Sequence, residues 1–147
     1  MSSELNIALK ENNIVTKEQQ AQFLAQCAYE TNWGMWLLEI GSVEYFEDKE
    51  YGFKYRGAGY IHLTWDYNYL AFSEAMGDPE IYKQGAVYVA ANYPWAAAGR
   101  FWNNNNFNAI VSNGGSVKDI TLIVSASTET ATAREGFYDK ILDILKK

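Results

Sequence analysis

Two glutamates, Glu30 and Glu39, are the residues whose type and spacing best suit acid–base chemistry. Glu30 ends the helix-patterned stretch QAQFLAQCAYE, and Gly34 lies between the two acids. Two carboxyl groups beside a sugar-sized gap are the minimum equipment for cleaving a glycosidic bond. The segment YRGAGYIHLTWDYNY at 55–69 is rich in aromatic residues, and these could form the walls of such a gap.

The two acids can act together only if a helix ends between them. On one unbroken helix, positions nine apart point to opposite faces, because each residue turns the helix by about 100°. TNWG at 31–34 offers an ending, since Gly34 tolerates the left-handed conformation that closes many helices. The sequence therefore predicts a chain reversal after Glu30, with Glu39 presented across a cleft.

Composition indicates one domain over residues 1–147 and excludes several classes of partner. The chain has 147 residues, of which 48% are hydrophobic, and a formal net charge of −6 without a Lys/Arg run. This charge argues against nucleic acid and gives no electrostatic attraction to an anionic cell wall. Cys27 is the only cysteine and His62 the only histidine, so we expect no disulfide, metal or cofactor.

The N-terminal residues MSSELNIALKENN lack the basic start and apolar core of a signal peptide. No apolar run approaches the roughly 20 residues that a membrane-spanning helix needs. We therefore expect a protein that is made in the cytoplasm and does not insert into a membrane. As a separate expectation, the protein is a monomer. If its target is the bacterial cell wall, the protein must reach it by release or delivery.

Local signals predict a mainly helical chain. The helix after Thr16 places Phe23, Leu24 and Cys27 on one face, with Glu30 at its edge, so its carboxyl should be partly buried and suited to proton donation. Helix starts are expected at Ser3, Thr16 with Gln19, Asp66, Asp78-Pro79-Glu80, Pro94, Ser116 with Asp119, and near Thr130. Residues 42–60 should form loop and short strand, and 103–106 and 112–115 loops. The last helix should bury Phe137, Ile141, Ile144 and Leu145.

Five pieces of the chain, in order, resemble the chitinase-like group of glycoside hydrolase family 19, especially its phage and bacterial endolysins. They are QFLAQCAYETNWG, Glu39, YRGAGYIHLTWDYNY, AAAGRFW and residues 124–138. The group shows a pattern like HFLAQ-x-x-HES, then a glycine-rich bend, a second Glu and YRGRG-L-IQLTG-x-x-NY. The pieces cover roughly residues 20–140. The resemblance implies a lysozyme-like, mainly α domain with a small β element at the substrate cleft.

The resemblance also implies a role for individual residues. Glu30 matches the general acid, Glu39 the general base of an inverting mechanism, and Thr64 a threonine that positions the attacking water. Arg56 is expected either at the substrate or in an ion pair with Glu30 or another acid. The positions expected to bind substrate are Trp33, Tyr55, Arg56, Tyr60, His62, Asn68 and Ser125.

The chain departs from the family pattern at several of these positions. Tyr29 replaces a histidine, Asn32-Trp33 the glycine bend, Ala58 the second arginine of YRGRG, His62 a glutamine, and Ser125-Ala126-Ser127 Asn-Gly-Gly. Our leading interpretation is a metal-free glycosidase that cuts β-1,4 bonds of bacterial peptidoglycan, as an endolysin does. Chitin is the alternative substrate. A catalytically silent carbohydrate-binding or structural module is the alternative from another class.

Overall fold

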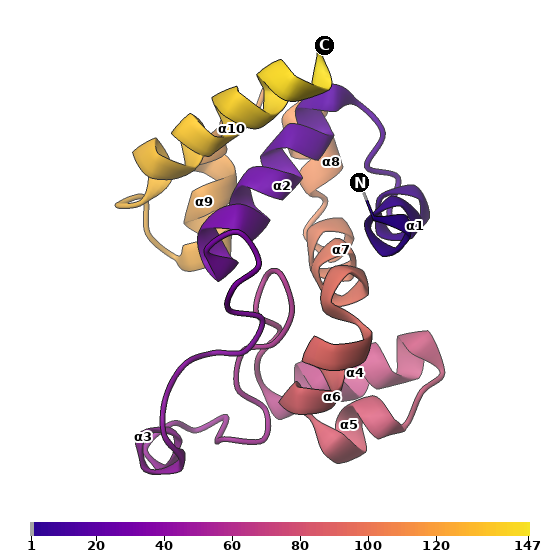
Figure 1. The fold of residues 1–147 in the computed structure, drawn as a ribbon, viewed down its shortest axis with the longest axis vertical. Helices are drawn as coiled ribbons and strands as arrows, with labels where there is room; N and C mark the ends of the chain where they lie inside the picture. Colours follow the sequence, from indigo (N-terminus) through magenta and orange to yellow (C-terminus); the bar gives the residue numbers. More distant parts are fainter. Residues whose placement is uncertain (1) are drawn as a thin grey trace.

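The computed structural model describes residues 2–147, and within them the chain is built almost entirely from helices (Figure 1). The helices are α1 (Ser3–Glu11), α2 (Lys17–Thr31), α3 (Val43–Glu47), α4 (Asp66–Met76), α5 (Glu80–Gln84), α6 (Ala86–Asn92), α7 (Pro94–Asn104), α8 (Phe107–Ser112), α9 (Val117–Ser125) and α10 (Ala131–Leu145). None of them is long and apolar enough to span a bilayer. The prediction of a mainly α chain is confirmed.

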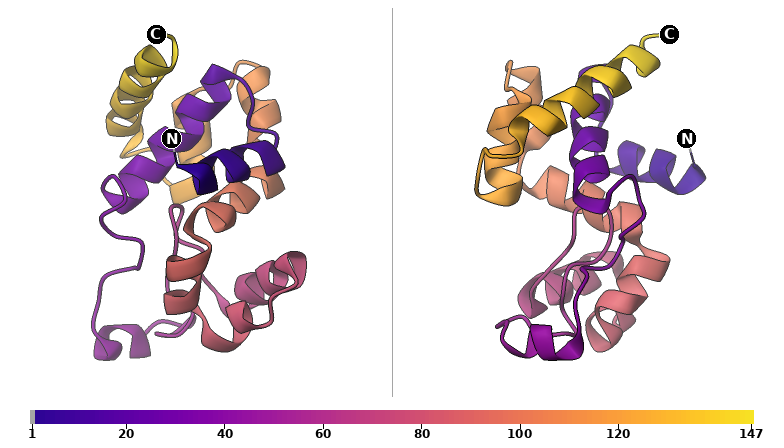
Figure 2. Two further views of the ribbon diagram at one scale, coloured as in Figure 1. Left: turned by 45° about the vertical axis from the view of Figure 1, so that its right-hand side comes forward. Right: turned by 60° about the vertical axis from the view of Figure 1, so that its left-hand side comes forward.

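The helices form two groups joined by α7 (Figures 1 and 2). In the first group α2 packs along α10, α9 packs against α10, and α1 packs against α7. In the second group α4 packs against α5, and α5 against α6. Each group has its own buried cluster. The first contains Phe23, Cys27, Trp102 and Phe107, and the second Ala58, Tyr69, Phe72, Ile81 and Val89.

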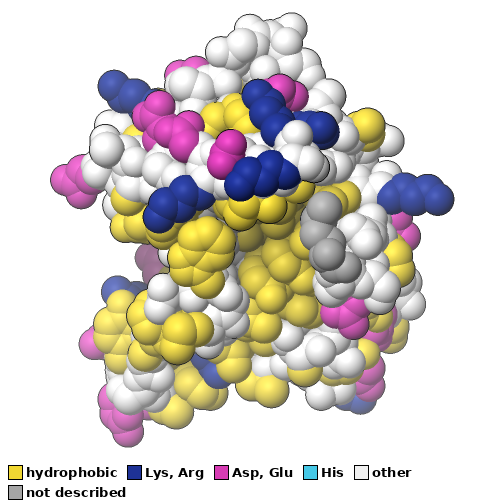
Figure 3. Space-filling model, turned by 45° about the horizontal axis from the view of Figure 1, so that its top comes forward, with side chains coloured by type: hydrophobic (Ala, Val, Ile, Leu, Met, Phe, Trp, Pro, Cys, Tyr) yellow, Lys and Arg dark blue, Asp and Glu magenta, His cyan; other side chains and the backbone are white. Residues whose placement is uncertain are grey.

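Many large hydrophobic side chains remain exposed. They include Trp33, Met35, Trp36 and Ile40 in the segment after α2, of which Met35 is 73% exposed. Figure 3 shows one face of the molecule, where hydrophobic side chains gather in a hollowed area below a band of charged side chains. Exposed apolar area of this kind commonly marks a site of interaction with a ligand, a protein or a membrane.

Several helices begin where a side chain accepts a hydrogen bond from a free backbone N–H group of the first turn. Thr16 and Gln19 form the expected capping box of α2, and Ser116 and Asp119 form that of α9. Pro94 is the first residue of α7, as predicted. The prediction for α1 was wrong by one residue, because the hydroxyl of Ser2, not Ser3, accepts the Leu5 N–H at 3.2 Å.

The chain reverses where the sequence predicted that it would. α2 ends at Thr31, and Asn32, Trp33 and Gly34 all have positive φ, at 48°, 59° and 89°. The Thr31 hydroxyl donates to the Cys27 carbonyl at 2.7 Å and accepts the Gly34 N–H at 2.9 Å. A side chain at Gly34 would also approach the Tyr60 ring to 3.2 Å. Glycine is therefore favoured here by its conformation, and a larger residue would also have to displace the Tyr60 ring slightly.

The segment between α2 and α4 holds the small β element, which amounts to two isolated bridges. Ala58 pairs with Leu38 and with Leu63, both antiparallel. The sequence predicted loop and short strand over 42–60, but residues 43–47 form the short helix α3, capped by the Ser42 hydroxyl at 3.1 Å. Ser42, a preferred N-cap residue whose hydroxyl accepts a hydrogen bond from the Tyr45 N–H, was the local signal for this helix start.

Three further local predictions need correction. Asp66 is the first residue of α4 and not its cap, because Trp65 takes the cap position with φ 79°. Asn103 and Asn104 continue α7 instead of forming a loop, since the Asn105 amide closes the helix on the Phe101 carbonyl at 2.8 Å. Ile144 is 65% exposed, because it lies about 100° around the helix from Leu145, which packs toward α2.

Candidate active site

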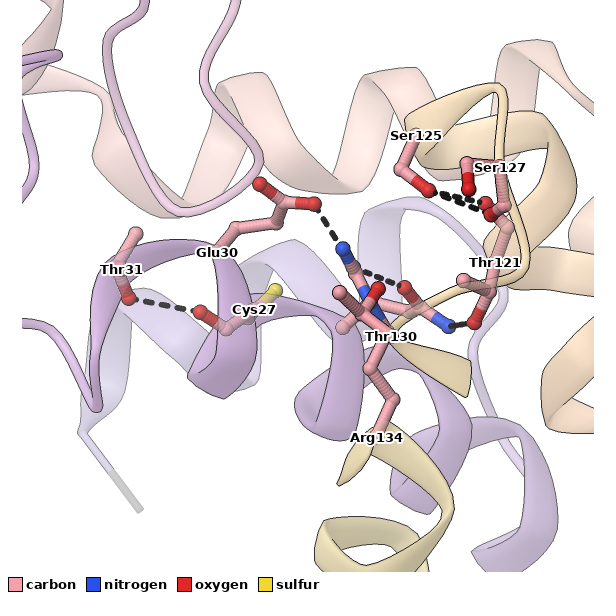
Figure 4. A network of polar contacts seen from close by, with 9 residues as sticks. Cys27, Glu30, Thr31, Thr121, Ser125, Ser127, Thr130 and Arg134 are labelled. Atoms are coloured by element: carbon pink, nitrogen blue, oxygen red, sulfur yellow. Dashed lines mark hydrogen bonds and ion pairs between the residues drawn. The ribbon is translucent and has the colours of Figure 1, made fainter. Parts of the chain in front are cut away.

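Glu30 lies in the last turn of α2 and forms an ion pair with Arg134 of α10 (Figure 4). Arg134 Nη1 is 2.8 Å from Glu30 Oε1, and the two side chains are 3% and 22% exposed. Within residues 2–147 no hydrogen-bond donor approaches the other oxygen, Oε2. The expected partial burial of Glu30 is thus observed, with one oxygen held and the other unbonded.

Arg134 is the centre of a buried polar network. Its Nη1 also donates to Gln26 Oε1 at 2.7 Å, and its Nε donates to Thr130 Oγ1 at 2.9 Å. The Gln26 amide in turn donates to Thr121 Oγ1 at 3.1 Å. The network joins α2, α9 and α10 beneath Glu30, so the direction of the Glu30 side chain is fixed by three helices.

Tyr29, which replaces a histidine of the family pattern, packs against the same arginine. The Arg134 guanidinium lies 4.3 Å from the centroid of the Tyr29 ring, and the ring itself is 6.3 Å from that of Phe137. A cation over an aromatic face is favourable, more so when it is shielded from water. Tyr29 therefore adds a contact to Arg134.

Glu30 lines a cavity of about 430 Å³ that lies between the two groups of helices. The lining residues come from the end of α2, the 61–65 turn, α4, α7 and the end of α9. They are Glu30, Ile61, His62, Leu63, Thr64, Trp65, Asn68, Ala71, Phe72, Ala97, Arg100, Phe101, Asn104, Asn105 and Val124. The structure thus brings together four predicted site residues: Glu30, His62, Thr64 and Asn68.

Hydrogen bonds fix the 62–68 wall of the cavity. The Thr64 hydroxyl donates to the His62 carbonyl at 2.8 Å, and the Asn68 amide donates to the Thr64 carbonyl at 2.9 Å. The His62 ring lies with Nε2 2.9 Å from the Trp36 carbonyl, and its backbone has φ 41°. His62 therefore connects the cavity wall to the segment that carries Glu39.

Glu39 is outside the set of residues that line this cavity, but it adjoins the cavity wall. Its N–H donates to the Gly57 carbonyl at 2.8 Å, and its Oε1 accepts the Gly57 N–H at 2.9 Å. A Cβ on Gly57 would lie 2.9 Å from His62 Cβ and 3.3 Å from Glu39 Cβ. The side chains of Glu39 and His62 therefore lie against the same face of Gly57, and His62 also lines the cavity.

Tyr51 holds the second oxygen of Glu39. Its hydroxyl donates to Glu39 Oε2 at 2.8 Å. Burial, followed by this hydrogen bond and the charge of Glu39, raises the pKa of Tyr51 to about 12, so the phenol keeps its proton. Both oxygens of Glu39 thus accept a hydrogen bond, an arrangement suited to an ionised carboxylate, which only accepts.

Arg56 and Tyr55 lie outside the lining set. Arg56 is buried, donates to the Phe53 carbonyl at 2.7 Å and stacks 3.8 Å from the centroid of the Phe53 ring. Burial lowers its pKa, an effect that the charges of Tyr69 and Glu39 oppose. The expected ion pair of Arg56 is wrong, since no acid of residues 2–147 lies within 4.0 Å of it. The Tyr55 hydroxyl donates to the Tyr82 carbonyl at 2.9 Å.

Trp33, Tyr60 and Ser125 also lie outside the lining set. Trp33 is 57% exposed and packs on Phe137, with ring centroids 4.8 Å apart. Tyr60 stacks on Trp95 at 3.5 Å. The Ser125 hydroxyl is within hydrogen-bond distance of the Thr121 and Ser127 carbonyls (Figure 4). The substrate-binding roles expected for these three residues remain predictions.

The remaining candidate metal ligands and the cysteine are placed as follows among the described residues. No three His, Cys, Asp or Glu side chains of residues 2–147 are grouped so that they could hold a metal ion. Cys27 is buried in the first core cluster, and burial, with the nearby charge of Glu30, raises the pKa of its thiol well above the usual value. A buried, protonated thiol is a poor nucleophile.

Sequence reasoning missed three residues of this region: Arg134, Tyr51 and Arg100. Arg134 carried a usable signal, because it falls three and seven positions before Phe137 and Ile141 on the apolar face of the last helix. A charged residue on such a face requires a buried partner. Arg100 lies in AAAGRFW, a segment that the resemblance included without pointing to this residue, and Tyr51 lies in a segment without a comparable pattern.

No family model matches the chain, and no curated protein matches it in sequence. Solved structures do match. A bacterial family 19 chitinase superposes with a TM-score of 0.79 at 23% identity, over 99% of this chain and 86% of that one. Chitinase C from Streptomyces griseus gives 0.75 at 21%, over 100% and 85%. The class IV chitinase of Zea mays gives 0.75 at 17%, over 99% and 82%. The chain therefore has the lysozyme-like fold of the family 19 chitinases.

Proposed function

We propose that the protein is an inverting glycosidase that hydrolyses β-1,4 bonds of bacterial peptidoglycan. Glu30 protonates the leaving oxygen, and Glu39 activates a water molecule that Thr64 helps to position. The observation that carries the proposal is the placement of Glu30, which is fixed by Arg134 on one oxygen and opens into a cavity between two groups of helices.

The geometry at Glu30 indicates which of its two carboxyl oxygens carries the donated proton. Because Arg134 occupies Oε1, a proton on this carboxyl belongs on Oε2, to which residues 2–147 offer no hydrogen bond. A general acid needs a hydrogen-bond path of about 2.6–3.2 Å to the atom that it protonates. Oε2 is therefore the atom assigned to the glycosidic oxygen.

The contacts of Glu39 support its assignment as base. Its two oxygens accept hydrogen bonds from the Gly57 N–H and the Tyr51 hydroxyl, which fixes the carboxylate without giving it a proton. Thr64 lies in the same cavity wall as His62, which shares the Gly57 face with Glu39. Inversion requires the two carboxyl groups of the complex to lie about 6.5–9.5 Å apart, against about 5–5.5 Å for retention.

Chitin is the second candidate substrate. The solved structures that share this fold are described as chitinases. Chitin and peptidoglycan both consist of β-1,4-linked N-acetylated amino sugars, so the same pair of carboxyl groups can cut either. Acting on peptidoglycan would place the protein at the bacterial cell wall after its release or delivery.

The test is to incubate the protein with purified peptidoglycan and with chitin oligomers and to identify the products by mass spectrometry. NMR of the first product should show the inverted anomer. Glu30→Gln should lower turnover by about 10²–10⁴-fold, since the proton donor is lost. The control is Glu44→Gln, which removes an exposed acid of α3 and should keep wild-type turnover.

Two results would contradict the proposal. Equal turnover of Glu30→Gln and wild type would remove Glu30 from the mechanism. Binding of either polymer without new reducing ends would identify the chain as a catalytically silent carbohydrate-binding module. Cleavage of chitin alone would retain the mechanism and replace the substrate.

A further inference from the structure

Arg100 is the one cavity-lining residue with a permanent positive charge. It lies in α7, is partly exposed, and faces the cavity that Glu30 also lines. Among residues 2–147 no carboxylate lies within 4.0 Å of its guanidinium, and its side chain makes no hydrogen bond. Arginine carries five N–H donors and remains charged at any ordinary pH, so these donors are available to a ligand.

The other two arginines of the chain each have partners within the protein. Arg134 binds Glu30, Gln26 and Thr130, and Arg56 donates to a carbonyl and stacks on Phe53. Glu30 is the only acid among the cavity-lining residues, and its Oε1 is already bound by Arg134. The charge of Arg100 is therefore left without a partner in the cavity, although the whole chain has a net charge of −6.

Asn104 extends this polar edge. It lies one helical turn after Arg100, lines the same cavity, and is exposed. Residues four apart on a helix are neighbours on one face, about 5–6 Å apart at Cβ. Together they present a guanidinium and a carboxamide to the same part of a ligand. A guanidinium fork suits a carboxylate, which it can bind through two parallel hydrogen bonds.

We propose that Arg100 is a specificity-determining residue that binds a carboxylate of the substrate. The inference rests on the proposed function, and it distinguishes the two candidate substrates. Chitin carries no charge that could pair with Arg100. The muramyl sugars of peptidoglycan bear a lactyl carboxylate, which is free in stripped strands, and stem peptides that carry further carboxylates. Arg100 thus makes the cavity favour an anionic amino-sugar chain over a neutral one.

The experiment compares three oligomers of equal length. One is a chitin hexamer, one is an alternating muramyl hexamer with free lactyl carboxylates, and one is the same hexamer with its stem peptides. For Arg100→Gln, the ratio of kcat/KM on the anionic oligomers to that on chitin should fall by about 10- to 100-fold, the range for losing hydrogen bonds to a charged group. For Arg100→Lys the same ratio should fall less, because lysine retains the positive charge but lacks the two-pronged guanidinium.

The muramyl arms identify which carboxylate is bound. A loss confined to the stripped hexamer assigns Arg100 to the lactyl group, and a loss confined to the peptide-bearing hexamer assigns it to the stem. The matched control is Lys140→Gln, which removes an exposed cation of α10 outside the cavity lining and should leave the ratio unchanged. Thermal unfolding confirms that each variant is folded.

Binding measurements keep this proposal separate from the proposed function. Titration calorimetry with Glu30→Gln and with Glu30→Gln/Arg100→Gln gives the affinity for each oligomer without turnover. A preference for the anionic oligomers that disappears in the double variant supports the role of Arg100 even if the wild type cuts nothing. An unchanged ratio, or equal losses on chitin and muramyl oligomers, would overturn it.

Discussion

Replacing Arg134 by Met should destabilise the protein by breaking the network beneath Glu30. The substitution keeps a long side chain but removes every donor. Arg134 donates to Glu30 Oε1 at 2.8 Å, to Gln26 Oε1 at 2.7 Å and to Thr130 Oγ1 at 2.9 Å. Gln26 is 0% exposed, so its oxygen would lose its donor in a place that water does not reach.

The size of the effect follows from burial. Removing one partner of a fully buried ion pair costs about 3–5 kcal/mol, because the other charge is left uncompensated. Glu30 is 22% exposed, so water would restore part of that loss. We expect the free energy of unfolding to fall by about 2–4 kcal/mol. For a chain of this size, each kcal/mol lowers Tm by about 2–4 °C, so Tm should fall by about 5–15 °C.

The assay is urea denaturation of wild type, Arg134→Met, Glu30→Gln and the double variant. The double-mutant cycle should give a coupling energy of about 1.5–3 kcal/mol, as residues in direct contact do. Lys147→Ala is the control, because its pair with Asp143 is 3.8 Å long and about three-quarters exposed. It should change stability by less than about 0.5 kcal/mol.

This reasoning would be refuted by a loss below about 1 kcal/mol in Arg134→Met together with a coupling energy near zero. That result would mean that the ion pair does not help to hold α2 against α10. Activity gives a second readout. If Glu30 is the proton donor, its misplacement in Arg134→Met should lower kcat by about 10²-fold, with a smaller effect on KM.

Three further predictions concern other contacts. Tyr51→Phe removes the hydrogen bond to Glu39 Oε2 and should lower kcat about 3- to 30-fold at an unchanged fold; an unchanged kcat would separate Glu39 from catalysis. Gly57→Ala places a methyl group 2.9 Å from His62 Cβ and should lower the free energy of unfolding, measured by urea denaturation, by about 1–3 kcal/mol. An unchanged free energy of unfolding would show that the cavity wall adjusts. The hydroxyls of Tyr88 and Tyr93 both donate to Asp78 and lower the pKa of its carboxyl below the usual value. The stability that the ionised Asp78 contributes is therefore present above the unfolded pKa and is lost as pH falls through the lower folded pKa. Tyr93→Phe should therefore narrow the stability difference between pH 6 and pH 2 in urea titrations, and an unchanged difference would rule this contact out.

Helix boundaries could be predicted where the determining contact is local. The capping box of Thr16 and Gln19 spans three residues, and the positive-φ turn at 32–34 depends on Gly34. When two adjacent residues can cap a helix equally well, the sequence does not say which of them is the cap. Ser2 and Ser3 are such a pair, and the shift of one residue at α1 is the result. Where a start signal was recognised, local chemistry therefore predicted the first residue of the helix to within about one residue. The start of α3 at Ser42 was not recognised.

The site was predicted in part. The helix end that positions Glu30 is local, and the turn that carries His62, Thr64 and Asn68 follows one sequence motif. The support beneath Glu30 is not local, since Arg134 and Gln26 are 108 residues apart. Periodicity places a residue on a face but does not say which face of which helix it meets. The residues that hold the acid were missed for that reason.

The three arginines show why tertiary structure decides the function of a charge. Each has a small residue beside it in the sequence, in YRG, GRF and ARE, and none of these triplets shows what the arginine contacts. Among residues 2–147, the fold brings an acid within 2.8 Å of Arg134 and the centroid of a ring within 3.8 Å of Arg56. Within that range it brings neither kind of partner to Arg100. A cation that the protein does not neutralise itself, at the edge of a cavity shared with Glu30, is available to neutralise a ligand. That difference, which no local pattern encodes, is the reason for assigning substrate selection to Arg100.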